Sequence, residues 1–197
     1  MPTLLAIVAS TREQRVGRLV ADWFVEHART LDHFDQIELA DLKDLDLPML
    51  NEPRHPRFRH YEFDHTKRWS AIVDRADAVV FVTPEYNFGA PPALTNAIDY
   101  LWHEWQYKPA GFVSYGGISG GLRSVQMTKQ IVTSVKMMPI PEAVTITFVA
   151  QLVKDGQFDP TEKHVGTIAP MLVELRKWTD ALSGVLAAAR TNAPRQP

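Results

Sequence analysis

The chain has 197 residues, the length of a single globular domain, and its 45% hydrophobic and 22% charged residues suffice for a packed core. Its formal net charge of -2 provides no overall positive potential for binding nucleic acid, although a local basic patch stays open. The absence of cysteine excludes disulfides, thiolate metal sites and cysteine nucleophiles. Any redox chemistry therefore requires a bound cofactor or a metal held by other ligands.

The first half of the chain reads as strands alternating with helices. Residues 4–9 form a continuous apolar run typical of a strand buried on both faces, and residues 17–31 carry apolar side chains at helical spacing. The pattern then predicts a strand at 37–40, irregular chain at 44–65, a helix at 66–76 and a strand at 77–83.

The second half continues the alternation. It predicts a helix at 92–102, a strand at 109–114, a helix at 122–137, a strand at 143–149, a turn at Asp155-Gly156 and a long helix at 159–190. Pro170 predicts a break or a late start in that last helix. We expect one domain over residues 1–190 and a disordered tail over 191–197. The whole pattern predicts an α/β fold, a flavodoxin-like doubly wound five-stranded parallel sheet of order 2-1-3-4-5.

No targeting or membrane segment is apparent. The apolar run at 4–9 is shorter than the core of a signal peptide, and no stretch approaches the roughly 20 apolar residues of a membrane span. We therefore expect a cytoplasmic protein with neither a membrane nor a nucleic acid as partner.

The segment after the first predicted strand, which we call the first loop, combines hydroxyl groups with arginines. It runs Ser10-Thr11-Arg12-Glu13-Gln14-Arg15-Val16-Gly17 and leads into a helix. The N–H groups and dipole of a helix N-terminus attract anions, and hydroxyl and guanidinium groups suit a phosphate dianion. The loop lacks the endings of Walker A and G-x-G-x-x-G motifs. It predicts a phosphate site, with a solvated helix start as the alternative.

Two further loops follow the third and fourth predicted strands. The second loop, Thr83-Pro84-Glu85-Tyr86-Asn87-Phe88-Gly89-Ala90-Pro91-Pro92, offers an aromatic face and an amide to a flat heteroaromatic ring. The third loop, Ser114-Tyr115-Gly116-Gly117-Ile118-Ser119-Gly120-Gly121, lets the backbone approach a ligand closely and donate N–H groups. Because ligands bind beyond the carboxyl ends of parallel strands, the three loops predict one site.

These loops carry a family resemblance. Thr83-Pro84-Glu85-Tyr86-Asn87, continued by Pro92-Ala93-Leu94-Thr95-Asn96-Ala97-Ile98-Asp99-Tyr100-Leu101, resembles the P-E-Y-N…P-x-x-L-K-N-A-I-D signature of the NADPH-dependent FMN reductase family. Ser10-x-Arg12-x-x-Arg15 resembles the phosphate loop of that family, and the third loop with Leu122-Arg123 resembles its glycine loop. The resemblance spans about residues 4–150. The family also includes quinone, azo-dye and chromate reductases.

The resemblance implies FMN as the cofactor and assigns residues to it. It implies that the phosphate is held by Ser10, Arg12 and Arg15 with the amides of Val16 and Gly17. It implies that the isoalloxazine ring is held by Pro84, Glu85, Tyr86 and Asn87 with the backbone of Tyr115, Gly116, Gly117 and Ser119. The chain departs from the family pattern at Ala9, at Phe88-Gly89-Ala90 and at Thr95, and the last two departures would reshape the substrate side of the ring.

The resemblance also implies the activity. We expect an FMN-dependent NAD(P)H oxidoreductase that reduces quinones, free flavin or similar small-molecule acceptors by ping-pong hydride transfer, with NADPH or NADH as cosubstrate. The flavin carries the chemistry, so no side chain is predicted to be catalytic. Two alternatives stay open: a non-catalytic FMN electron carrier, and a flavin-less regulatory or binding module of the same fold.

Two other features bear on partners. His55, His60 and His65 have no recognised ligand spacing, so no metal is expected. The apolar helix at 92–102, followed by Trp105 and Tyr107, has an aromatic density that predicts packing against its own copy in a homodimer or a tetramer.

Overall fold

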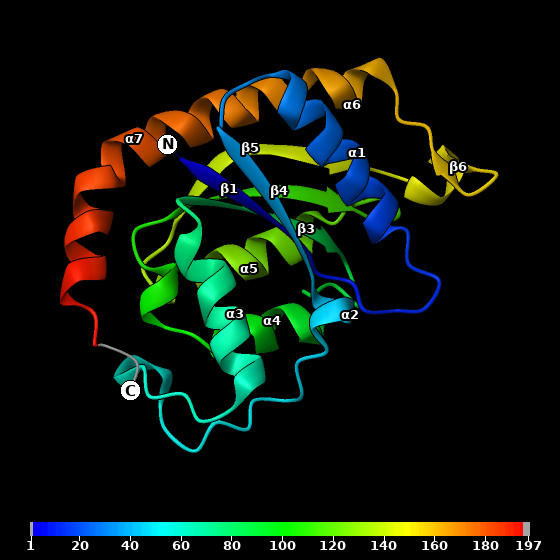
Figure 1. Ribbon diagram of the computed structural model, residues 1–197. Helices are drawn as coiled ribbons and strands as arrows, with labels where there is room; N and C mark the ends of the chain where they lie inside the picture. Colours follow the sequence, from blue (N-terminus) through cyan, green and yellow to red (C-terminus); the bar gives the residue numbers. More distant parts are fainter. Residues whose placement is uncertain (1, 195–197) are drawn as a thin grey trace.

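The computed structural model describes residues 2–194 and shows a parallel sheet covered by helices on both faces (Figure 1). The sheet order is β2-β1-β3-β4-β5, and each neighbouring pair is parallel. The strands are β1 (Thr3–Val8), β2 (Gln36–Asp41), β3 (Ala78–Pro84), β4 (Pro109–Tyr115) and β5 (Met138–Ile146). This confirms the predicted α/β flavodoxin-like sheet of order 2-1-3-4-5.

The helices divide between the two faces of the sheet. On one face lie α1 (Gly17–Thr30) and α7 (Ile168–Asn192), and on the other lie α3 (Asp64–Arg75), α4 (Pro92–Asp99) and α5 (Leu122–Ser134) (Figure 1). A hydrophobic core lies on each face of the sheet, and β1 contributes to both. Leu4 packs towards α1 and α7, whereas Leu5 packs towards the helices on the opposite face. Burial on both faces explains why the strand shows no alternation of polar and apolar residues.

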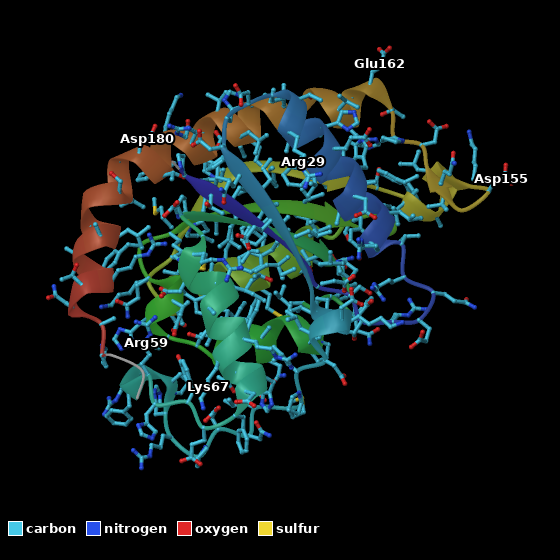
Figure 2. The ribbon with its side chains drawn as sticks, in the orientation of Figure 1. Arg29, Arg59, Lys67, Asp155, Glu162 and Asp180 are labelled. Atoms are coloured by element: carbon cyan, nitrogen blue, oxygen red, sulfur yellow. The ribbon has the colours of Figure 1, made fainter. Side chains whose placement is uncertain are left out.

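Short elements complete the chain. They are α2 (Leu42–Leu45), η1 (Pro56–Phe58), η2 (His103–Trp105), η3 (Val149–Leu152), β6 (Val153–Lys154), β7 (Gln157–Phe158) and α6 (Glu162–Gly166). Strands β6 and β7 pair antiparallel around the predicted turn, and Asp155 at its tip points away from the sheet (Figure 2). The turn is confirmed, although the hairpin around it was not predicted.

The largest boundary error concerns β5. The strand begins at Met138, whereas the sequence pattern predicts a start at residue 143. Pro139 and Pro141 lie in this segment and discourage a strand assignment, but β5 is an edge strand and can tolerate proline. The N–H groups that proline lacks are not all needed at a sheet edge.

The predicted C-terminal helix is two helices. Helix α6 ends at Gly166 and α7 starts at Ile168, which places Pro170 in the first turn of α7, where its missing N–H removes no helix hydrogen bond. The break predicted from Pro170 is confirmed. Helix α7 continues to Asn192, so residues 191 and 192, which were expected in a disordered tail, are helical. Residues 195–197 of that predicted tail lie outside the described residues.

The aromatic residues near α4 belong largely to the core of this chain. The helix ends at Asp99, and Trp105 is fully buried with its ring centroid 5.8 Å from that of Trp69 and 6.2 Å from that of Phe81. The indole N–H of Trp105 donates to the carbonyl of Ile98. This domain therefore buries Tyr100 and Trp105, whereas Trp102 and Tyr107 stay partly exposed, and packing of this segment against a second copy stays a prediction.

Among residues 2–194, no helix combines the length and apolar character needed to span a membrane. The same residues contain no group of three or more histidine and acidic side chains placed to hold a metal ion.

Candidate functional site

The three loops meet at the carboxyl edge of the sheet. The hydroxyl groups of Ser10 and Tyr86 lie 2.6 Å apart and join the first loop to the second. The Ser119 hydroxyl donates to the Glu85 carboxylate at 2.8 Å and joins the third loop to the second. Parallel strands end at one edge, so residues far apart in sequence become neighbours here.

A cavity of about 200 Å³ opens between these loops. It is lined by Ser10, Arg12, Gln14, Arg15, Val16, Pro84, Glu85, Tyr86, Tyr115, Gly116 and Val149. The structure thus brings most of the predicted site residues together. Gly17, Asn87, Gly117 and Ser119 lie on the same loops outside this lining. Sequence reasoning missed Gln14 and Val149, and no residue pattern marks either of them.

The first loop presents a row of unused donors. Within residues 2–194, the backbone N–H groups from Thr11 to Gly17, apart from that of Arg15 at the end of a turn, donate to no protein acceptor, and α1 has no side-chain cap. Arg12 is exposed and forms no ion pair with a described residue, whereas Arg15 is mostly buried and lies 2.6 Å from Asp41. Unpaired amides beside two guanidinium groups form an electropositive concavity that suits a phosphate.

Tyr115 supports the first loop from below. Its hydroxyl is buried close to Ser10 and Tyr86, and a Cβ on Gly17 would lie 2.2 Å from it. Desolvation, followed by the nearby Tyr86, raises the pKa of Tyr115, so the hydroxyl keeps its proton. The side chain therefore lies against the start of α1, and the assignment of the Tyr115 backbone to the ring stays a prediction.

The second loop ends in a tight turn that exposes an aromatic ring. Tyr86 and Gly89 exchange two backbone hydrogen bonds of 3.0 and 2.9 Å, and the φ angles of Asn87 and Phe88 are 50° and 71°. Two consecutive left-handed residues define a type I′ turn, in which glycine would be the unstrained choice at the Phe88 position. The Phe88 ring is 71% exposed, and the Arg123 guanidinium lies 3.9 Å from its centroid.

The Glu85 carboxylate is fully engaged by neighbouring groups. It accepts from the Ser119 hydroxyl, from the Arg123 backbone N–H at 3.1 Å and from Arg123 Nε at 2.7 Å. Burial raises the pKa of Glu85, but these hydrogen bonds outweigh it and leave the pKa lowered. Glu85 thus fixes the spacing between the second and third loops. The sequence motif contains Arg123 but did not single it out as part of this clamp.

The third loop keeps its backbone open to a ligand. A Cβ on Gly117 would meet no atom within 4 Å, so the space above it is free. The N–H groups of Gly117, Ile118 and Ser119 have no acceptor within the described part of the chain. Gly121 has a φ of 85°, and a Cβ there would lie 2.9 Å from the Tyr115 backbone nitrogen. Glycine is therefore required at position 121 for conformational reasons.

The donors present fit FMN. The first loop offers amides and cationic side chains to a phosphate, and Arg15 Nε beside it is a buried polar atom with no partner among residues 2–194. The open Gly117 backbone offers N–H donors to the polar edge of a flat ring. A phosphate at one end and a planar heteroaromatic ring at the other are the two parts that the site can satisfy.

Comparisons with known proteins agree with this geometry. The family model for NADPH-dependent FMN reductase matches residues 2–151. An NAD(P)H-dependent FMN reductase of Schizosaccharomyces pombe is 38% identical over 172 residues, covering 85% of each chain. A quinone reductase of Pseudomonas putida is 32% identical over 149 residues, covering 72% of this chain and 76% of that protein. The flavoenzyme FerB from Paracoccus denitrificans, an NAD(P)H:acceptor oxidoreductase, has the same fold with a TM-score of 0.71 at 23% identity, covering 92% of this chain and 98% of FerB.

Proposed function

The chain belongs to the NADPH-dependent FMN reductase family, and on that premise we propose that it is an FMN-dependent NAD(P)H oxidoreductase that reduces quinones, free flavin or similar acceptors. The observation that carries the proposal is the meeting of three loops whose donors match the two ends of FMN. The first-loop amides that have no acceptor within residues 2–194, among them those of Val16 and Gly17, are the strongest part of it.

Particular residues would hold the cofactor. For the phosphate they are Ser10, Arg12 and Arg15 with the amides of Val16 and Gly17, and for the ring they are Pro84, Glu85, Tyr86, Asn87, Tyr115, Gly116, Gly117 and Ser119. Glu85 acts through the clamp that spaces the loops, and Tyr115 acts from beneath the first loop.

The chemistry of the reaction belongs to the cofactor. Bound FMN would supply the hydride-transfer chemistry between a reduced nicotinamide and an acceptor. The protein would bind and orient the cofactor, and the N–H donors of the third loop, which have no acceptor among the described residues, would stabilise negative charge at the edge of the ring. No side chain needs to act as a general acid or base.

The proposal predicts turnover with ping-pong kinetics. The purified protein with FMN should oxidise NADPH or NADH and reduce a quinone, giving parallel lines in double-reciprocal plots. The reason is spatial, since donor and acceptor would have to use the same flavin face, bounded by Tyr86, Phe88 and the Gly116-Gly117 backbone. Intersecting lines would show that both substrates bind together.

Two controls separate the alternatives. A yellow protein that does not oxidise either nucleotide would be an electron carrier, and a protein that binds no flavin would be a regulatory or binding module. Either result would overturn the enzyme proposal.

We also propose a homodimer built on the exposed apolar side chains around the site. Phe88, Ile118, Leu122 and Met127 come from the second loop, the third loop and α5, and each is more than two-fifths exposed. Apolar surface of this kind beside a site is typical of protein interfaces. Sedimentation should give twice the chain mass at micromolar concentration, and Leu122→Glu should give monomers, whereas Val185→Glu on the distant part of α7 should not. A wild-type monomer would contradict the proposal.

We place the protein in the cytoplasm, where reduced nicotinamide nucleotides are supplied. Fractionation of cells that express the full chain tests this location, and recovery of the chain outside the cytoplasmic fraction would contradict it.

A further inference from the structure

Asp41 is a buried carboxylate at the end of β2 that contacts the phosphate end of the site. Its side chain is 3% exposed. Its Oδ1 accepts from the backbone N–H of Lys43 at 3.0 Å and caps α2. Its Oδ2 lies 2.6 Å from Arg15 Nη2 and 3.6 Å from Arg18 Nη1. The carboxylate is therefore fixed from two sides, by a helix start and by two guanidinium groups.

Arg15 is held by this carboxylate at one end of its guanidinium group. Its side chain is 11% exposed and lines the cavity between the loops. Its Nε is buried and has no hydrogen-bond partner among the described residues. Asp41 thus orients the guanidinium of Arg15, which still has a hydrogen-bond donor without an acceptor. Arg12, in contrast, is exposed and has no ion pair within the described chain.

We propose that Asp41 is a positioning residue for the cofactor phosphate: it holds the Arg15 guanidinium in place beneath the first loop. This inference rests on the proposed function, because it assumes that FMN is the ligand. A free arginine loses considerable side-chain freedom when it binds an anion. An arginine already fixed by a buried carboxylate has lost much of that freedom in the folded protein, so it binds the phosphate more tightly.

The sign of the effect distinguishes this role from simple charge compensation. Asp41 is negative and lies close to the place where the phosphate would bind, so Coulomb repulsion alone predicts tighter FMN binding when it is neutralised. Loss of positioning predicts weaker binding. Asparagine caps helix starts as well as aspartate does, so Asp41→Asn should keep the cap on α2.

The experiment compares FMN with riboflavin, which has the same ring and no phosphate. Flavin affinities are measured by fluorescence quenching on the full chain. For Asp41→Asn we expect FMN affinity to fall about tenfold and riboflavin affinity to change by less than about twofold, because only FMN carries the phosphate that the positioned Arg15 guanidinium would bind. Arg15→Lys keeps the charge but loses the planar fork, and should show the same selective loss. The double variant should lose no more than the larger single loss.

Asp44→Asn is the matched control. Asp44 is exposed and reaches Arg18 Nη1 at 3.8 Å, and no ion pair joins it to Arg15. The Asp44→Asn variant measures the long-range effect of removing one negative charge. Its ratio of FMN to riboflavin affinity should stay within about twofold of the wild-type ratio.

Each other outcome overturns the inference. Tighter FMN binding by Asp41→Asn would show that Asp41 only neutralises Arg15. Equal weakening of both flavins would show a purely structural role. If Asp41→Asn does not fold, Arg15→Lys decides, and an unchanged flavin ratio in that variant refutes the inference. A wild-type protein that binds neither flavin refutes the proposed function itself, independently of Asp41.

Discussion

Wild-type protein is expected to gain stability between about pH 7.5 and about pH 9.5, by up to about 1.4 kcal/mol per pH unit, whereas Lys108→Met should show no such gain. Lys108 directly precedes β4 and is fully buried. Its Nζ donates to the carbonyl oxygens of Val73 and Asp74 in the last turn of α3. A neutral amine has two N–H groups and can satisfy both carbonyls without a charge.

The pKa of Lys108 sets the direction of this effect. Desolvation and, to a smaller extent, Arg190 lower it to about 7 against the opposing effect of the acidic groups of Asp74, Asp77 and Glu104. Above about pH 7 the folded protein has released the proton, but the unfolded chain keeps it up to its ordinary pKa of 10.5. The unfolded state therefore binds more protons in this range, so the free energy of unfolding rises with pH.

Urea unfolding at several pH values checks the prediction. Lys108→Met leaves two carbonyls without their donor and should be less stable at high pH, but its stability should lack the lysine-dependent slope. Lys154→Met removes an exposed lysine from β6 and should keep the wild-type slope. A wild-type slope in Lys108→Met would show that the buried amine stays charged in the folded protein.

Gly17→Ala is expected to destabilise the protein and to weaken FMN binding, although alanine normally favours a helix over glycine by about 1 kcal/mol. The new Cβ would lie 2.2 Å from the Tyr115 hydroxyl oxygen, which belongs to a rigid and buried ring. Overpacking of this kind costs about 1 to 3 kcal/mol and would displace the start of α1. The midpoint temperature of thermal unfolding should fall by roughly 2 to 10 °C in a chain of this size.

Tyr115→Phe should rescue the glycine substitution in part. Without the hydroxyl oxygen, the nearest atom to the new Cβ is Tyr115 Cζ at 3.2 Å. The double variant should therefore be more stable than the sum of the two single effects by about 1 kcal/mol or more. Gly184→Ala is the control, because a Cβ there meets no atom within 4 Å and should stabilise α7. Additive single effects at positions 17 and 115 would refute the proposed clash.

Local patterns were enough to predict the architecture. A strand buried on both faces leaves an apolar run, as at β1 and β3, and an amphipathic helix repeats its apolar side chains, as at α1. Both signals lie within short stretches of sequence, so they can be recognised without knowing which elements pack against each other. The failures have the same origin, since the prolines in β5 are acceptable only because that strand lies at an edge.

The aromatic segment at 92–105 shows the limit of such patterns. Its density of aromatic side chains predicts a subunit interface. In the structure, however, Trp105 packs against Trp69, which lies on α3. Composition cannot tell whether rings are absorbed by the same domain or by a second copy, because that depends on which helices share a face of the sheet.

The amino-acid sequence by itself determined the order of the strands and the loops that carry the site, because glycine, proline and hydroxyl residues act on the backbone next to them. Only the tertiary structure decided the roles of individual side chains. Arg12 and Arg15 look equivalent in the first loop, but Asp41, 26 residues away from Arg15, engages only the second of them. Gly17 looks like an ordinary helix start, but the Tyr115 hydroxyl occupies the space of its Cβ. Burial and hydrogen bonding join residues that parallel strands bring to one edge, and no local pattern in the sequence encodes which of those residues will touch.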